Sequence, residues 1–228
     1  MKKFYLPIAL IIWATFIASS YFYNRGVTLE SNENTVLEMA RSFFKVILNT
    51  RAWNAGHGGV YTIVKDNNQP NPYLYDSLRD LTTTNGIKLT KINPAYMSRQ
   101  IFEIAEKDTN VYFHITSLNP IRPQNEADGW EKISLSKFEK KVPEVFERVL
   151  SNTGDYYRYM APLMVEDPCM KCHASQGYKI GQVRGGISIS THAERFDAIL
   201  ETELLNLGIF HSVFLVIGLV AIFSFFKL

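Results

Sequence analysis

The sequence predicts an α+β fold, in which antiparallel strands and flanking helices form one domain between two membrane-spanning helices. Three patterns indicate this fold class. Both ends of the chain are long and apolar, apolar residues recur at helical spacing in several stretches, and shorter stretches alternate apolar and polar residues. A chain of 228 residues has room for one ordinary domain plus its attachments.

The composition excludes wholesale disorder and gives no reason to expect nucleic-acid binding. Hydrophobic residues make up 46% of the chain and charged residues 20%, which is typical of a packed protein. Three of the 24 basic residues lie at the apolar ends, so the middle of the chain, which holds all 22 acidic residues, is close to neutral. A near-neutral domain lacks the basic surface that attracts phosphates.

Both ends of the chain predict membrane-spanning helices. Residues 4–24 and 204–226 carry no Lys, Arg, Asp or Glu, and about 20 apolar residues in a helix cross the roughly 30 Å hydrocarbon core. Lys2 and Lys3 precede the first segment and Lys227 follows the second, so we expect both termini in the cytoplasm. The expected parts are a membrane helix or signal anchor at 1–24, an extracytoplasmic domain with helical stalks at 25–203, and a membrane helix at 204–228.

A cleavable signal peptide is the alternative interpretation of the first segment. Its basic start and apolar run are followed by the small residues Ala18, Ser19 and Ser20, which suit a cleavage site. Under either interpretation the middle of the chain is exported.

Helical spacing of apolar residues continues beyond the first membrane segment and recurs three more times. Gly56, Gly58 and Gly59 should end the first of these helices, and Pro94 suits the first turn of the second. The last helix, with His192 at its start, should lead directly into the second membrane segment. In chain order we expect these helices at residues 29–48, 94–107, 130–150 and 193–207.

Strands are expected where apolar and polar residues alternate. In the clearest case Val111, Phe113 and Ile115 share one face, and the residues between them share the other. The Asn85-Gly86 pair suits a hairpin turn that leads into another strand. In chain order we expect strands at residues 60–64, 87–92, 111–118, 156–164 and 183–190.

One motif indicates chemistry. The only two cysteines stand in the run Pro168-Cys169-Met170-Lys171-Cys172-His173, which is the C-x-x-C-H attachment sequence for c-type haem. The two thiols can form thioethers with the two vinyl groups of one porphyrin edge. His173 can then place its imidazole on the iron as the proximal ligand. We therefore predict one covalently bound haem c.

Three other interpretations of the cysteine pair remain open. A thioredoxin-like dithiol also uses C-x-x-C, although it normally opens a helix after a strand. A zinc site would need ligands from elsewhere, and no second pair of cysteines or histidines with zinc-finger spacing occurs. A structural disulfide would suit an oxidising compartment.

The chain also resembles a family: the PAS-like domain that binds c-type haem outside the bacterial cytoplasm, often as the sensory region of histidine kinases and chemotaxis receptors. The resemblance covers roughly residues 51–190. The matching stretches are residues 51–54, 57–61, 71–74, 89–100, 115–120, 169–173 and 184–188. It implies a PAS-like antiparallel sheet flanked by helices, haem thioethers at Cys169 and Cys172, and His173 as proximal ligand. It also implies a bacterial cytoplasmic membrane, with the domain on the periplasmic side.

The chain departs from that family in two respects. Some members are thought to place a cysteine on the distal side of the iron, and here both cysteines are used for attachment. Only Lys227 and Leu228 follow the second membrane segment, so we expect no kinase or chemotaxis domain.

The sixth iron ligand is open at this stage. Our first candidate is His57, whose flanking glycines would let the backbone approach a haem closely, and the alternative is His114. Methionine ligation or a five-coordinate or water-bound iron are the other arrangements. Haem propionates could pair with Arg184. The further candidates are Met97, Met160 and Met164 for the iron, and Arg99 and Arg158 for the propionates.

We expect no enzyme activity, because no nucleophile arrangement or paired acid and base is recognisable. The first hypothesis is a sensor module in which haem responds to redox poise or a diatomic gas, and which signals through a separate membrane-bound transducer. The second is a membrane-bound monohaem cytochrome that passes electrons to a partner, and the third is a haem-free ligand-binding sensor domain. We also consider a homodimer.

Overall fold

The computed structural model describes residues 2–152, 154–173 and 176–227, but not the side chains of Lys2, Lys3, Asp108, Lys171 and Cys172. The chain divides into two compact units. One comprises Met1–Val36 and Ala193–Leu228, and the other Leu37–His192. Helix α1 (Lys2–Gly56) runs through the boundary and contributes to both units.

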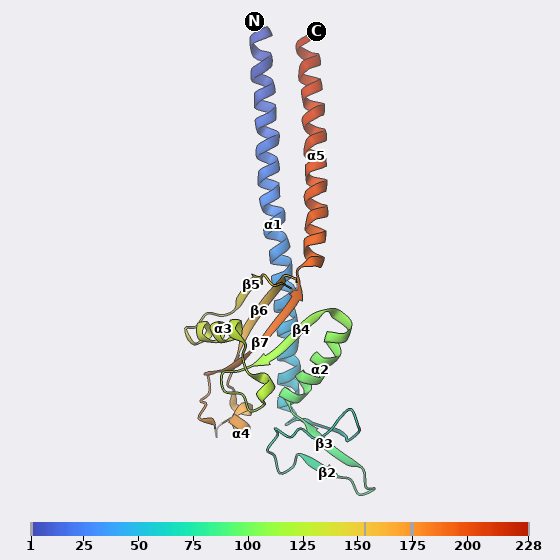
Figure 1. Cartoon of the computed structure of the whole chain (residues 1–228), viewed down its shortest axis with the longest axis vertical. Coiled ribbons are helices and arrows are strands. Elements are labelled where there is room, and N and C mark those ends of the chain that lie inside the picture. Colours follow the sequence, from blue (N-terminus) through green and yellow to red (C-terminus); the bar gives the residue numbers. More distant parts are fainter. Residues whose placement is uncertain (1, 153, 174–175, 228) are drawn as a thin grey trace. The chain divides into compact units, whose positions relative to one another are not determined.

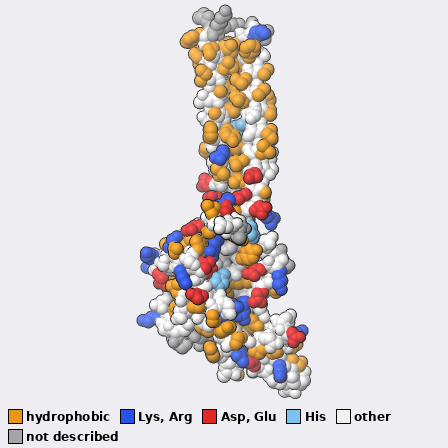
Figure 2. All heavy atoms as spheres, viewed as in Figure 1, with side chains coloured by type: hydrophobic (Ala, Val, Ile, Leu, Met, Phe, Trp, Pro, Cys, Tyr) orange, Lys and Arg blue, Asp and Glu red, His pale blue; other side chains and the backbone are white. Residues whose placement is uncertain are grey.

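The first unit is a pair of helices, formed by the N-terminal part of α1 and by α5 (Glu194–Lys227). The two helices contact each other where Trp13 Nε1 donates to the carbonyl of Leu215 at 3.2 Å and where Ser20 Oγ lies 3.2 Å from His211 Nε2. Large apolar side chains cover much of their outer surface (Figure 2). Both helices are long and apolar enough to cross a membrane, although a signal sequence near the N-terminus would share these properties.

The second unit contains a four-stranded antiparallel sheet (Figure 1). Its strand order is β4-β7-β6-β5, so β7, the last strand in the sequence, lies in the interior of the sheet next to β4. The strands are β4 (Val111–Thr116), β5 (Val145–Val149), β6 (Tyr156–Met164) and β7 (Val183–His192).

Helices cover both faces of this sheet. On one face, Phe44 of α1 and Phe102 of α2 (Pro94–Thr109) are buried with Tyr159 of β6 and Ile187 of β7. On the other face, α3 (Gly129–Glu139) packs Leu135 and Phe138 against Met160 of β6. Tyr159 and Met160 are neighbours in the strand and point to opposite faces, as strand geometry requires. The two resulting cores fix the positions of β4 and β7, which border the site described below.

A smaller antiparallel sheet has the strand order β1-β3-β2. Its strands are β1 (Val60–Ile63), β2 (Asp80–Thr82) and β3 (Lys88–Ile92). Gly86, with φ of +84°, lies in the turn between β2 and β3, so the expected hairpin turn forms here. Strand β3 leads through Asn93 into α2, and α2 forms one wall of the site described below.

The structure confirms the α+β class and antiparallel strands near every expected range. Two predictions were wrong. Residues 130–150 do not form one helix, because α3 ends at Glu139, Lys141 takes a left-handed conformation with φ of +65°, and β5 follows. His192 ends β7 instead of beginning a helix. In the first case the apolar residues after Pro143 pair with β6, which the spacing pattern alone could not show. The short strand β2 was not predicted.

Candidate functional site

The cysteine motif folds as two short turns of helix after β6. A 3₁₀ turn, η2 (Asp167–Cys169), holds Pro168 in its first turn, and α4 (Met170–His173) follows at once. The backbone N–H of Cys169 donates to the carbonyl of Glu166 at 2.9 Å. Cys169 is a free, half-buried cysteine. The side chain of Cys172 lies outside the part of the chain that the structure describes, so the predicted second thioether position is not located.

His173, the last residue of α4, borders a cavity of about 280 Å³ inside the second unit. Aromatic and aliphatic side chains from α2, β4 and β6 form a large part of its wall, among them Phe102, Phe113, Ile115 and Leu163. Four guanidinium groups also line the cavity, and the described lining includes two carboxylates. These charged residues are Arg51, Arg99, Arg122 and Arg184 against Glu103 and Glu106. An apolar wall with excess positive charge favours a ligand that is apolar in its body and acidic at its edge.

Two described side chains meet the same nitrogen of the His173 ring. Nδ1 lies 2.7 Å from Gln176 Oε1 and 3.1 Å from Arg184 Nε. Burial, together with the charges of Arg184 and Arg51, lowers the pKa of His173, so its neutral form is favoured. The Arg184 Nε–H can donate to Nδ1 only in the tautomer whose proton is on Nε2. The Gln176 amide oxygen can only accept, so Nδ1 carries the proton when it bonds Gln176. Nε2 is then the nitrogen with a lone pair, as iron ligation requires.

Arg184, the second residue of β7, contacts this histidine through its guanidinium group. Its guanidinium donates to Ser117 Oγ and, at 3.2 Å, to Gln176 Oε1, and it lies 4.8 Å from the ring centre of Tyr178. Burial lowers the pKa of Arg184, and the charge of Cys169 acts in the opposite direction on both Arg184 and Arg51. The two guanidinium groups therefore lie within electrostatic range of the first cysteine of the motif.

His114 borders the same cavity from β4, but its ring is held on both sides. Nδ1 lies 3.0 and 3.1 Å from the two carboxylate oxygens of Glu131, and Nε2 lies 3.0 Å from the carbonyl oxygen of Gln124. Both neighbours are acceptors, so both nitrogens donate and the ring is an imidazolium. The hydrogen bond to Glu131 raises the pKa of His114 accordingly. In this arrangement His114 has no lone pair for a metal.

Glu131, on the first turn of α3, is the centre of this polar cluster and is only 1% exposed. It forms a capping box with Asp128, whose backbone N–H donates to Glu131 Oε2 at 3.1 Å, and it also accepts from Ser188 Oγ. Burial alone would raise the pKa of Glu131, but the bonds from His114 and Ser188 lower it to about 2. The sequence pattern Asp128 to Glu131 could have shown the capping box, but not the ion pair.

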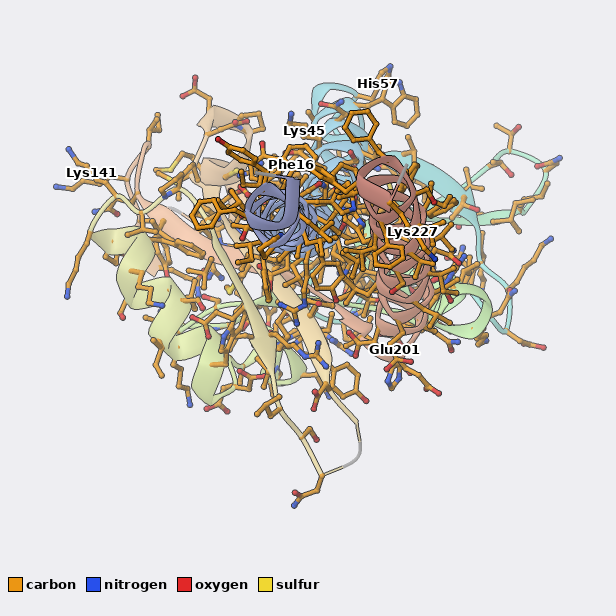
Figure 3. All side chains as sticks on the ribbon, turned by 90° about the horizontal axis from the view of Figure 1, so that it is seen from above. Phe16, Lys45, His57, Lys141, Glu201 and Lys227 are labelled. Carbon is orange, nitrogen blue, oxygen red and sulfur yellow. The ribbon has the colours of Figure 1, made fainter. Side chains whose placement is uncertain are left out.

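The other candidate ligands lie outside the described lining of the cavity. His57 is exposed at the end of α1, with Nδ1 2.7 Å from the carbonyl of Trp53 and its ring against the Trp53 ring. Figure 3 shows His57 on the outer side of the C-terminal end of α1. Met160 is fully buried in the core under α3, and Met164 is 46% exposed. Met97 and Arg158 are also absent from the lining, and Arg158 pairs with Asp128 at 2.9 Å.

The sequence reasoning missed Gln176, Arg51, Arg122 and Glu131 as functional candidates. Gln176 follows His173 by three residues, a spacing that places side chains on one side of a helical turn, and could have been considered on that ground. Arg51 lies within a stretch that carried the family resemblance. Its role at the cavity depends on α1 passing the motif, which no local pattern reveals.

Comparison with known proteins gives one family match. The family model described as Tll0287-like matches residues 30–191, which is most of the chain. A solved structure titled "Crystal structure of the cyanobacterial heme-protein Tll0287" is similar at 13% identity and a TM-score of 0.46, covering 69% of this chain and 95% of that chain. No curated protein matches.

Proposed function

Because the chain belongs to the Tll0287-like family, we propose that it is a haem protein that binds one haem c covalently through the C-x-x-C-H motif. The protein after which the family is named is described as a cyanobacterial haem protein. The finer prediction, a PAS-like sensor domain of the kind found in histidine kinases and chemotaxis receptors, is part of this proposal.

The observation that carries the proposal is the fit of the cavity to the chemistry of a haem. The motif histidine, His173, borders a cavity with an apolar wall and an excess of guanidinium groups. One wall atom, Thr116 Oγ1, is buried and makes no hydrogen bond with the described residues, so the cavity also has an unsatisfied polar group to offer a ligand. A flat apolar ring with two carboxylates at one edge satisfies each of these features.

Residues of this chain would hold such a haem in distinct ways. Cys169 and Cys172 would carry the thioethers, and His173 would bind the iron through Nε2 while Gln176 and Arg184 orient its ring. The haem would supply a redox-active iron with an axial position for a ligand. His57 and His114 remain the predicted protein ligands for that position. As placed, His57 would have to enter the cavity, and His114 would have to release Gln124.

We further propose that the protein is a sensor of redox poise or of a diatomic gas, anchored in a membrane by α1 and α5 and coupled to a separate transducer. Two features support this proposal. No methionine or cysteine is among the described residues that line the cavity, and the ring of His114 is engaged at both nitrogens, so the distal side favours an exchangeable ligand. In addition, β7 leads through one residue into α5, a direct connection from the site's own strand to a membrane-type helix.

The test is the visible spectrum of the ferrous full-length protein, produced with haem-attachment machinery, before and after addition of carbon monoxide. A covalent haem whose spectrum shifts with carbon monoxide supports an exchangeable sixth position and a gas sensor. A covalent haem whose spectrum does not change indicates a firmly held sixth ligand and favours a redox sensor or an electron-carrying cytochrome. Protein without covalent haem would overturn the proposal and favour a haem-free ligand-binding domain.

A further inference from the structure

The four guanidinium groups of the cavity form two pairs with different neighbours. Arg51 and Arg184 lie within electrostatic range of Cys169 and His173, at the attachment motif. Arg99 and Arg122 line the same cavity from α2 and from the loop after β4. Arg122 has Arg99, Tyr73 and Glu103 as its charged or ionisable neighbours.

The second pair is poorly compensated. Arg122 Nη1 donates to Asn125 Oδ1 at 3.0 Å, but burial and the charge of Arg99 both lower the pKa of Arg122. Arg99 lies over the ring of Tyr96, 4.4 Å from its centre, and its ion pair with Glu103 is long, at 4.0 Å. The Glu103 side chain is 63% exposed, so solvent weakens that pair. Two like charges that face one cavity, with only this long and solvent-weakened ion pair among the described residues, would be stabilised by an acidic ligand.

We propose that Arg99 and Arg122 form a carboxylate-binding site, which holds the propionates when the cavity contains haem. This second statement rests on the proposed function. In haem, the vinyl groups and the propionates lie at opposite edges of the porphyrin, so thioethers at Cys169 put the propionate edge away from the motif. Arg51 and Arg184 lie beside the motif and brace Ser98 and His173, respectively. Among the described residues, the neighbours of Arg99 and Arg122 lie outside the motif. These two arginines are therefore the partners for the propionate edge of the haem, in place of the earlier candidate Arg184.

Arginine suits this role because its planar fork bonds both oxygens of a carboxylate. The wall between the two pairs carries Phe102 and Phe113, whose rings stack at 4.9 Å and supply apolar surface. A ligand with an apolar body and terminal carboxylates would therefore contact every class of residue in the lining. Glu103 and Glu106 are the acidic side chains of α2 that border the same cavity.

The experiment compares the full-length protein with the double variant Arg99→Gln/Arg122→Gln and with Arg79→Gln. Arg79 pairs with Asp80 at 2.6 Å in the same unit and is absent from the cavity lining, which it meets through a 3.4 Å bond from Nη1 to the backbone carbonyl of Asn71, so its substitution removes a charge that does not face the cavity. In haem-loaded protein, the midpoint potential is titrated against pH. An arginine partner holds a propionate pKa low, so its removal should move the pH inflection upward by about 1 to 3 pH units, while Arg79→Gln leaves it in place. No movement in the double variant would overturn the propionate assignment and leave haem binding intact.

A second arm does not depend on haem. Full-length protein produced without haem-attachment machinery is heated with and without succinate, a small dicarboxylate. A rise in the unfolding temperature of the unsubstituted chain that disappears in the double variant and persists in Arg79→Gln supports a carboxylate site. If the chain shows this rise but carries no covalent haem when it is produced with haem-attachment machinery, the proposed function fails and the pair binds carboxylates from another source. Absence of the rise in a protein without covalent haem would overturn the inference.

Discussion

His173 and His114 border the same cavity, and their surroundings prepare them for opposite roles. Burial and the charge of Arg184 favour the neutral form of His173, and the amide oxygen of Gln176 favours the tautomer in which Nε2 carries the lone pair. The ring of His114 lies between a buried carboxylate and a backbone carbonyl, which hold it as an imidazolium. The residue type alone therefore does not identify an iron ligand in this family member. What the second nitrogen of each ring meets decides its role.

The largest expected effect separates the two histidines by their effect on haem. His173→Ala should abolish the histidine-ligated ferrous spectrum of the haem-loaded protein, because it removes the nitrogen that we expect on the iron. His114→Ala, the matched substitution, should retain that spectrum. Visible spectra at equal covalent haem content measure both. Loss of the spectrum in His114→Ala together with its retention in His173→Ala would contradict these roles of the two histidines.

The next effect concerns stability. Glu131→Gln should lower the free energy of unfolding by about 2 kcal/mol, because it leaves the His114 imidazolium without its buried carboxylate and disturbs the bond from Ser188. Glu126→Gln is the control, since Glu126 forms an exposed ion pair with Lys132 and should change the free energy by less than about 0.5 kcal/mol. Denaturant unfolding of the full-length protein in detergent gives both values. Equal losses in the two variants would show that the buried pair adds nothing.

The sequence indicates candidate residues for the site more directly than it indicates how they are arranged. Cys169, Cys172 and His173 form a contiguous motif, so their chemistry could be inferred from spacing alone. The roles of Arg51 and Arg184 depend on α1 and β7 meeting around one cavity, and that of Glu131 depends on α3 meeting β4 and β7; such long-range contacts leave no local pattern. The glycines around His57 suggested close approach to a ligand. In the structure Gly58 and Gly59 have positive φ values of 70° and 90°, which the turn from α1 into β1 requires.

The predictions of strands and helices also differed in how well they matched the structure. The alternation in residues 111–118 predicted β4 correctly, because Val111 and Phe113 pack against one core while Tyr112 is exposed on the other face. The stretch 130–150 failed because apolar residues after Pro143 continued a helical spacing by coincidence, while pairing with β6 determined their actual structure. Local patterns therefore predicted strands such as β4, β6 and β7, and missed the helix boundary that pairing with a neighbouring strand sets.

A smaller effect should appear in the pH dependence of stability. Glu131 has a pKa lowered to about 2 from an ordinary value of 4.5, so its contribution is present above pH 4.5 and is lost as the pH falls towards 2. His114 has a raised pKa, so its contribution is complete below its ordinary value of 6.5 and is lost as the pH rises through the raised pKa.

The ion pair should therefore stabilise the fold most between about pH 4.5 and 6.5. The measurement is the difference in unfolding temperature between the unsubstituted protein and Glu131→Gln across pH 3 to 9. We expect this difference to be largest within that window and to shrink on both sides. A difference that stays constant with pH would contradict the assignment of His114 as an imidazolium.

The smallest expected effect tests the surroundings of His173 without removing it. Gln176→Glu offers Nδ1–H a stronger acceptor, which makes the imidazole a better donor to ferric iron and should lower the midpoint potential. Gln176→Leu removes the acceptor and should raise the potential. The two substitutions are expected to move the potential in opposite directions, a result that a loss of packing alone would not produce. Gln69→Leu serves as the control, because Gln69 is exposed and lies outside the cavity lining. Potentials that shift in the same direction for both variants would mean that Gln176 does not orient His173. The contrast between the two histidines would then depend on His114 and Glu131 alone.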